Sequence, residues 1–173
     1  MGLPVQKFIA STNVNDVVPE YLHTGILTPR PSVHTLSNAM DVGNPSNFAG
    51  MLDLYGGNLQ AIKNDITGYA FTDTDTEVAM RSVMEAHHYM LDPHGAIGYL
   101  GLKKYLLENP SDVNAIFLET AHPAKFKEVV ERAIGQSIPL PETLEKFVKG
   151  KKDAVVVSNV YGEFRKTLLR LLT

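Results

Sequence analysis

The sequence predicts an α/β domain with three layers, in which helices cover both faces of a mostly parallel sheet. Short apolar segments typical of buried strands alternate along the chain with longer segments of helical periodicity, and this alternation favours parallel strands joined by helices. The 173 residues are enough for one domain with a sizeable core. Of these residues, 44% are hydrophobic and 20% are charged, which is the balance of a folded soluble protein.

Four apolar segments are predicted to form the strands of this sheet. Residues 7–11 come first, residues 69–72 second and residues 154–157 last. The clearest strand is 115–118, because it is a continuous apolar run typical of a strand buried on both faces. Residues 28–36 contain too many prolines for a central strand, so we expect a loop or an edge there.

Helices are predicted between and after these strands. Asn15 is a candidate N-cap for the first helix, which Gly25 follows, and Gly56, Gly57 and Gly135 are placed to end two later helices. Prolines stand in the first turn of three of them. The predicted helices are 16–23, 45 to about 55, 73–90, a helix from 93 onward, 123–134 and 161–172.

Composition excludes several classes of function. The net charge is −3 and the basic residues are scattered, so no basic face for nucleic acid is expected. The chain has no cysteine, which excludes disulfides, thiolate zinc sites and a cysteine nucleophile and suits a cytoplasmic location. It also has no apolar run of membrane-spanning length and no segment typical of a signal peptide, so no membrane partner is expected.

The string "ETAHPAKF", residues 119–126, follows the clearest strand directly. Ligands of open α/β sheets bind outside the carboxyl ends of the strands, so this turn is a candidate site. Pro123 needs no backbone donor in a first helical turn. An alternative is that Thr120 and His122 only cap the following helix, although histidine is a poor cap beside serine, threonine or asparagine.

Four strings together resemble threonine synthase, in the right order and at plausible spacings: "FIASTNVNDVVPEYLHTG", "LSNAMDVGNPSNF", "DPHGAIGYLGL" and "ETAHPAKFKEVVE". The resemblance covers nearly the whole chain and is to the C-terminal part of that enzyme, so residues 1–173 are expected to be a single partial domain. It implies a fold-type-II enzyme that uses pyridoxal phosphate to convert O-phospho-L-homoserine and water into L-threonine and phosphate.

The resemblance also implies parts that this chain lacks. The family's Schiff-base lysine, the asparagine near the ring hydroxyl and the glycine-rich phosphate loop all lie upstream of the matched region, and no corresponding strings occur in these residues. We therefore expect no catalytic residue in this chain, no activity of the chain alone and no binding of pyridoxal phosphate by it alone.

Thr120 is the residue for which the resemblance implies the clearest role. It would stand against the pyridine nitrogen of the cofactor, where a hydroxyl donates a hydrogen bond and leaves the nitrogen unprotonated. Ala121 would leave room for the flat ring. His122 and Lys125 stand near a helix start, where positive charge and backbone donors suit an anion.

Further candidates for the substrate cleft come from the other three strings. Asn13 and Asn15 follow the first strand, with helix capping by Asn15 or Asp16 as the alternative. A second group crowds one helix start and is suited to a phosphate, or else to a capped surface helix: Asn44, Ser46 and Asn47.

The string "DPHGAIG" contributes two more candidates. Asp92 is expected to cap the helix, and His94 to face the cleft as an acid, a base or a phosphate partner, or else to be structural. Three glycines recur every third residue in this helix and are expected to allow close packing against another backbone: Gly95, Gly98 and Gly101.

Two other classes of function stay open at this stage. A metal-dependent hydrolase would use some of His87, His88, Asp92, His94 and His122, but no His-Glu-x-x-His spacing occurs. A non-catalytic binding or interaction domain is the other, since the last helix has basic residues beside leucines and could dock on a partner. A partial sheet would also leave apolar surface uncovered, so self-association is expected.

Overall fold

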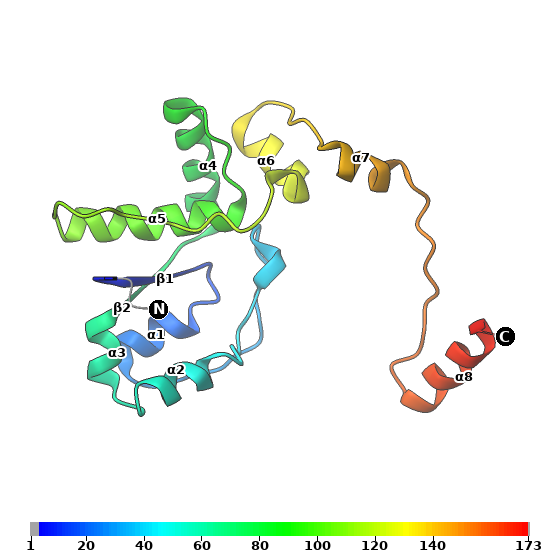
Figure 1. Ribbon diagram of the computed structural model, residues 1–173, viewed down its shortest axis with the longest axis horizontal. Coiled ribbons are helices and arrows are strands. Elements are labelled where there is room, and N and C mark those ends of the chain that lie inside the picture. The colour runs from blue at the N-terminus through cyan, green and yellow to red at the C-terminus, as the bar shows by residue number, and fades with distance from the viewer. Residues whose placement is uncertain (1–3, 173) are drawn as a thin grey trace. The chain divides into compact units, whose positions relative to one another are not determined.

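The computed structural model describes residues 4–172, which form two compact units that divide after Pro139. The larger unit contains a parallel sheet of two strands, β1 (Phe8–Thr12) and β2 (Ile66–Ala70), and helices lie on both faces of it (Figure 1). Phe8 pairs with Ile66 and Thr12 with Ala70, so both strands end at the same edge. The predicted α/β class, with a parallel sheet between helical layers, is confirmed.

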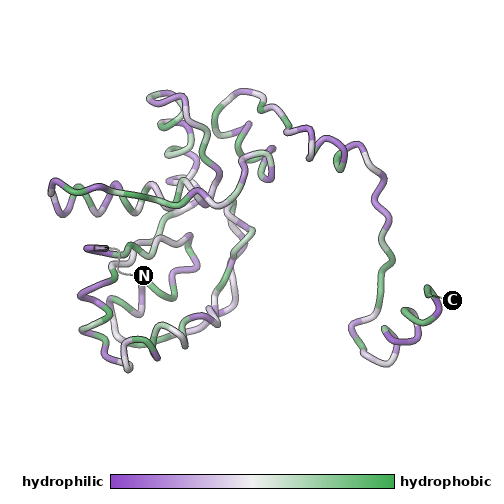
Figure 2. Tube along the Cα trace, viewed as in Figure 1, coloured by the Kyte–Doolittle hydropathy of each residue, from purple (hydrophilic) through white to green (hydrophobic). Residues whose placement is uncertain are grey.

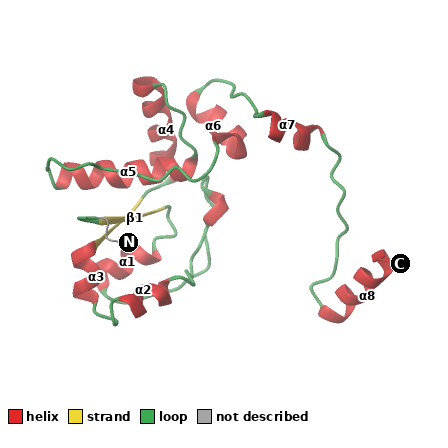
Figure 3. Cartoon of the chain, viewed as in Figure 1, coloured by secondary structure: helices red, strands yellow, loops and turns green. Residues whose placement is uncertain are grey.

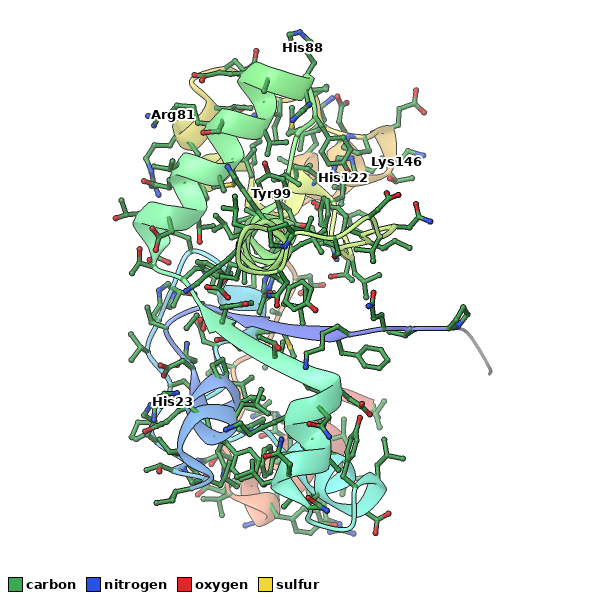
Figure 4. The ribbon with its side chains drawn as sticks, turned by 90° about the vertical axis from the view of Figure 1, so that its left-hand side faces the viewer. His23, Arg81, His88, Tyr99, His122 and Lys146 are labelled. Atoms are coloured by element: carbon green, nitrogen blue, oxygen red, sulfur yellow. The ribbon has the colours of Figure 1, made fainter. Side chains whose placement is uncertain are left out.

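The helices of the larger unit fall on the two sides of this sheet. α1 and α3 pack on one face and α5 on the other, and Figure 4 shows His23 of α1 on one side and Tyr99 of α5 on the opposite side. The helical segments in chain order are α1 (Val17–Thr24), the 3-10 turn η1 (Asn38–Met40), α2 (Phe48–Leu54), α3 (Leu59–Asp65), α4 (Asp73–His87), α5 (Pro93–Glu108), the 3-10 turn η2 (Pro123–Phe126) and α6 (Lys127–Ile134).

Local sequence rules predicted several of the helix ends. Gly25 and Gly135 end α1 and α6 in the left-handed conformation, with φ of 77° and 71°. The side chain of Asp92 caps α5, as expected, by accepting hydrogen bonds from the amides of His94 and Gly95.

Other helix predictions were wrong. Neither Asn15 nor Asp16 caps α1 with its side chain, because Asn15 is bonded to Asn13 and Val33 while Asp16 forms an ion pair with Arg30. α2 begins at Phe48 and not at Pro45. The short helices α3 and α7 (Glu142–Lys149) were not predicted at all.

Two of the four predicted strands are not strands in the described structure. Residues 115–118 and 154–157 are extended but pair with no other strand among residues 4–172 (Figure 3). Ile116 and Val156 are 80% and 97% exposed. An apolar sequence alone does not make a strand, because a strand needs a partner for its backbone groups. The predicted strand at 69–72 was shifted, since β2 covers Ile66–Ala70.

Two apolar clusters hold the larger unit together. Below the sheet, the rings of Tyr21 and Phe48 meet edge to face with centroids 4.7 Å apart, in a cluster that includes Leu22 and Ile62. On the other face, α4 packs against α5 and α6, where Met80 and Val130 are fully buried.

The glycines of α5 let this helix lie close to its neighbours. A Cβ at Gly101 would lie 1.8 Å from Ser11 Oγ of β1 and 3.0 Å from Ser11 Cβ. A Cβ at Gly98 would meet the Cβ of Phe117 at 3.7 Å, and one at Gly95 would lie 1.7 Å from Glu119 Oε2. The close packing expected for these glycines is therefore found at Gly95 and Gly101, whereas the distance at Gly98 is that of an ordinary van der Waals contact.

The smaller unit contains α7 and α8 (Tyr161–Leu172), with the extended stretch 150–160 between them. No residue of either helix is buried within the described chain. Figure 2 shows apolar residues in this stretch, where Val155 and Val157 are also exposed. Among the described residues, no helix has both the length and the apolar character needed to cross a membrane.

The close contact of α5 with β1 predicts that Gly101→Val will lower the free energy of unfolding by about 1–3 kcal/mol, because the added atoms overpack against Ser11. The matched control is Gly50→Val in α2, where nothing lies within 4 Å of the added Cβ. It should change stability by less than about 0.5 kcal/mol. Urea unfolding of both variants measures this, and equal losses would show that the α5 contact is not tight.

Candidate functional site

The candidate site lies where the extended segment before η2 runs beside the N-terminal half of α5. The ring of Phe117 meets that of Tyr99 edge to face, with centroids 5.9 Å apart. The exposure of side chains alternates along this segment: Phe117 and Glu119 are half-buried, whereas Leu118 and Thr120 are exposed. Successive side chains of an extended backbone point in opposite directions, so Glu119 faces α5 and Thr120 faces away from it.

Thr120 has a free hydroxyl, since no described residue forms a hydrogen bond with its side chain. The capping alternative holds for His122 only: its Nδ1 accepts a hydrogen bond of 3.1 Å from the amide of Ala124. Figure 4 shows His122 on the side of the sheet that α5 covers. Lys125 lies in η2 and is exposed. Capping therefore uses His122 and leaves Thr120 available.

A second feature, Glu119, was not predicted from the sequence. Its Oε1 accepts a hydrogen bond of 2.8 Å from the amide of Asp92, and Asp92 Oδ1 accepts one of 2.7 Å from the amide of His94. One oxygen of each carboxyl group, Asp92 Oδ2 and Glu119 Oε2, is buried and has no hydrogen-bond partner in residues 4–172. The sequence gives no signal for this pair, because residues 92 and 119 meet only when the extended segment crosses the start of α5.

Burial and the nearby carboxyl group of Asp92 together raise the pKa of Glu119 to about 7. The amide hydrogen bond from Asp92 opposes this shift, because it stabilises the charged form. Desolvation is the largest cause, so Glu119 takes up a proton far more readily than an ordinary surface glutamate.

His94, in the first turn of α5, is half-buried. Its ring is tilted against that of Phe126, with centroids 5.4 Å apart, and its Nε2 is buried without a partner. His94 therefore lies beside the candidate site, and no described residue forms a hydrogen bond with its Nε2.

Asn13 and Asn15 belong to a buried polar network and not to an open surface. Asn13 Nδ2 lies 2.9–3.0 Å from the side-chain oxygens of three residues in the segment 35–41, and Asn15 Nδ2 donates to Asn13 Oδ1 and to the carbonyl of Val33. Both asparagines are more than nine-tenths buried. The partners of Asn13 are Thr35, Ser37 and Asp41. The network ties residues 33–41 to the end of β1.

The three polar residues expected at a helix start lie just before α2 in the structure. Asn44, Ser46 and Asn47 are exposed, and Asn47 is the N-cap residue without a side-chain cap bond. Because α2 has only seven residues and begins after all three, they stand in a loop.

Within the described residues, no group of three or more histidine and acidic side chains is arranged to hold a metal ion. His88 ends α4 in the left-handed conformation, and both it and His87 are exposed. The residues considered for a metal-dependent hydrolase therefore do not converge.

Comparison with known protein sequences shows which proteins this chain is similar to. The family model for the C-terminal region of threonine synthase matches residues 95–167. Threonine synthase from Haemophilus influenzae is 42% identical over 170 residues, which are 98% of this chain and 39% of that protein. The enzyme from Escherichia coli is 44% identical over 145 residues, which are 83% of this chain and 32% of that protein.

Solved structures give the same result. The crystal structure of threonine synthase from Escherichia coli matches 98% of this chain with a TM-score of 0.86 at 38% identity, and the match covers 39% of that chain. A threonine synthase from Brucella melitensis with bound pyridoxal phosphate matches 99% of this chain with a TM-score of 0.83 at 28% identity, over 41% of its own length.

The chain thus spans about 39% of the relatives that it matches most fully. Both the sequence and the fold agree over nearly all of its residues. The chain thus matches the C-terminal part of threonine synthases in both sequence and fold.

Proposed function

We propose that this chain supplies the C-terminal part of an enzyme that converts O-phospho-L-homoserine and water into L-threonine and phosphate with pyridoxal phosphate. The observation that carries the proposal is the match of 98% of the chain to a solved threonine synthase, with a TM-score of 0.86. The Schiff-base lysine and the phosphate loop would come from the part of the enzyme that precedes this region.

The residues of this chain fit one edge of the cofactor. Pyridoxal phosphate acts, when bound, as an electron sink for carbanion chemistry. Thr120 has an exposed hydroxyl with no partner among the described residues, so it can donate one hydrogen bond to the pyridine nitrogen. A neutral donor leaves that nitrogen unprotonated and limits electron withdrawal, whereas a carboxylate would hold a proton there.

The substrate phosphate is assigned to side chains that remain free. Lys125 carries positive charge close to the start of η2, and His122 keeps its Nε2 available because only Nδ1 is used in capping. The loop before α2 adds exposed polar groups, and His94 is a further candidate. Asn13 and Asn15 are given a structural role instead, because their side chains are bonded within the network.

A cytoplasmic location and the absence of nucleic-acid and membrane partners belong to the same proposal. The chain has no cysteine and a net charge of −3 with scattered basic residues, which supports a reducing compartment and argues against a nucleic-acid surface.

A non-catalytic interaction domain is the second candidate. The exposed apolar segments favour it, because Ile116, Leu118 and Val156 are 74–97% exposed and would bind another sheet or another copy. In the first proposal the same segments pair with strands of the preceding part of the enzyme.

Because the chain has no Schiff-base lysine motif, the 173-residue chain alone is expected to release no phosphate from O-phosphohomoserine above a control without protein. A chimera in which these residues replace the corresponding part of the Haemophilus influenzae enzyme should be active. Phosphate release and threonine formation measure both. An active isolated chain would contradict the division of the site, and a folded but inactive chimera would favour the interaction domain.

In that chimera, Thr120→Ala should weaken binding of pyridoxal phosphate, because it leaves the ring nitrogen without its donor. Loss of such a bond costs about 0.5–1.5 kcal/mol, or about 1–3 kcal/mol when a partner stays unsatisfied, which corresponds to about a tenfold weaker affinity per 1.4 kcal/mol. Thr120→Asp should retain the cofactor but give side products at the expense of threonine.

Cofactor absorption and product analysis measure these changes. The matched control is Thr74→Ala, which changes an exposed threonine of α4 and should alter neither. Normal binding and products in both Thr120 variants would remove Thr120 from the site.

The exposed apolar segments predict that the isolated chain self-associates and binds a hydrophobic dye. Ile116→Lys and Val156→Lys together should reduce both effects, because each places a charge on a segment that would otherwise pair. Sedimentation and dye fluorescence measure this. A wild-type chain that stays monomeric, binds no dye and melts sharply would argue against uncovered sheet surface.

A further inference from the structure

Three buried polar atoms at the start of α5 have no hydrogen-bond partner among the described residues. They are Asp92 Oδ2, Glu119 Oε2 and His94 Nε2. Most buried polar atoms in proteins are hydrogen-bonded, so three unbonded ones in the same place need a physical explanation. Asp92 is fully buried, which makes its unpartnered oxygen the most costly of the three.

The backbone forces the two carboxyl groups together. Glu119 Oε1 accepts from the amide of Asp92, while Asp92 Oδ1 accepts from the amides of His94 and Gly95. Gly95 makes the approach possible, since a Cβ there would lie 1.7 Å from Glu119 Oε2. Two negative charges held this close and partly out of water repel each other strongly.

Other charged groups of the neighbouring elements are used elsewhere or form no hydrogen bond with the two carboxyl groups among the described residues. In α4, Arg81 donates to the carbonyl of Ala133, and Glu77 is paired with Arg132 of α6. From the site itself, His122 caps η2 and Lys125 is exposed. His94 is the remaining titratable neighbour, and its buried Nε2 forms no bond to either carboxyl group.

We propose that Asp92 and Glu119 share one proton, and that this protonated pair fastens the segment carrying Thr120 to the start of α5. One carboxyl oxygen then donates to the other, so both unpartnered oxygens are satisfied at once. The proton resides mainly on Glu119, because the Asp92 carboxylate accepts the two amide hydrogen bonds that cap the helix.

The electrostatics of the site support this arrangement. The pKa of Glu119 is raised to about 7, mainly by burial and further by the neighbouring carboxyl group of Asp92, against the opposing effect of the Asp92 amide. Glu119 therefore keeps its proton over a range of pH in which an exposed glutamate is fully charged.

Glu119 is in this way a positioning residue for Thr120. The half-buried side chain of Glu119 is held against α5, and the next side chain of an extended backbone points to the opposite side. Fixing Glu119 therefore fixes the direction of the Thr120 hydroxyl. This consequence for Thr120 rests on the proposed function, whereas the shared proton does not.

The amide of Asp92 reports directly on the pair, because it donates to Glu119. In the ¹⁵N-labelled 173-residue chain, its NMR signal should move with a midpoint near pH 7, the raised pKa of Glu119. Glu119→Gln, which cannot ionise, should abolish this midpoint. Gly95→Ala should abolish it as well, because the added Cβ displaces the Glu119 carboxyl group. His94→Asn is the matched control and should retain it.

Folding stability gives a second measurement that needs no assigned spectrum. A carboxyl group whose pKa is raised in the folded state favours folding most at low pH, and this contribution falls as pH rises from the ordinary value of 4.5 through about 7. Relative to Glu119→Gln, the folding equilibrium constant of the wild-type chain should fall about tenfold across that window. This is less than the full shift implies, because Glu119 is only half-buried.

Several outcomes would overturn the proposal: no midpoint in the wild-type chain, a midpoint that persists in Glu119→Gln, or one that His94→Asn removes. The last would place the proton on His94. If the shared proton is found but the chimera described above neither binds pyridoxal phosphate nor forms threonine, the proposed function fails and the proton pair stands.

Discussion

The absence of side chains along one face of α5 is the constraint on which the arrangement of the larger unit depends. Gly101 meets β1 at Ser11, Gly98 faces the segment at Phe117, and Gly95 leaves room for the carboxyl group of Glu119. The helix therefore contacts the sheet and the extended segment through successive turns of the same face. A side chain at Gly95 or Gly101 would push its neighbour away, because the added Cβ would lie less than 2 Å from it.

This contact determines which polar groups of the candidate site are free. Asp92 and Glu119 come together because α5 starts where the extended segment passes. His122 is used in capping η2, and the alternating direction of the backbone leaves Thr120 exposed. The packing of the helix and the availability of the hydroxyl are thus two consequences of one geometry.

Sequence patterns predicted features that depend on neighbouring residues. Asp92 before Pro93, and Gly25 and Gly135 after helical segments, act as short-range rules require. The same rules failed at Asn15, because its side chain bonds to Val33, eighteen positions away, and not to the helix that follows it. The helix α3 was missed because its seven residues contain too few turns for a clear period.

Features that depend on distant partners could not be predicted in this way. Residues 115–118 have the composition of a buried strand, yet Ile116 is 80% exposed because no described strand lies beside it. Asn13 illustrates the opposite case: a residue predicted to be open to a ligand is buried by Thr35, Ser37 and Asp41. Composition thus indicates which segments can form strands and which side chains can bind ligands. Only the spatial arrangement decides which side chains are already bonded and which, like the hydroxyl of Thr120, remain free.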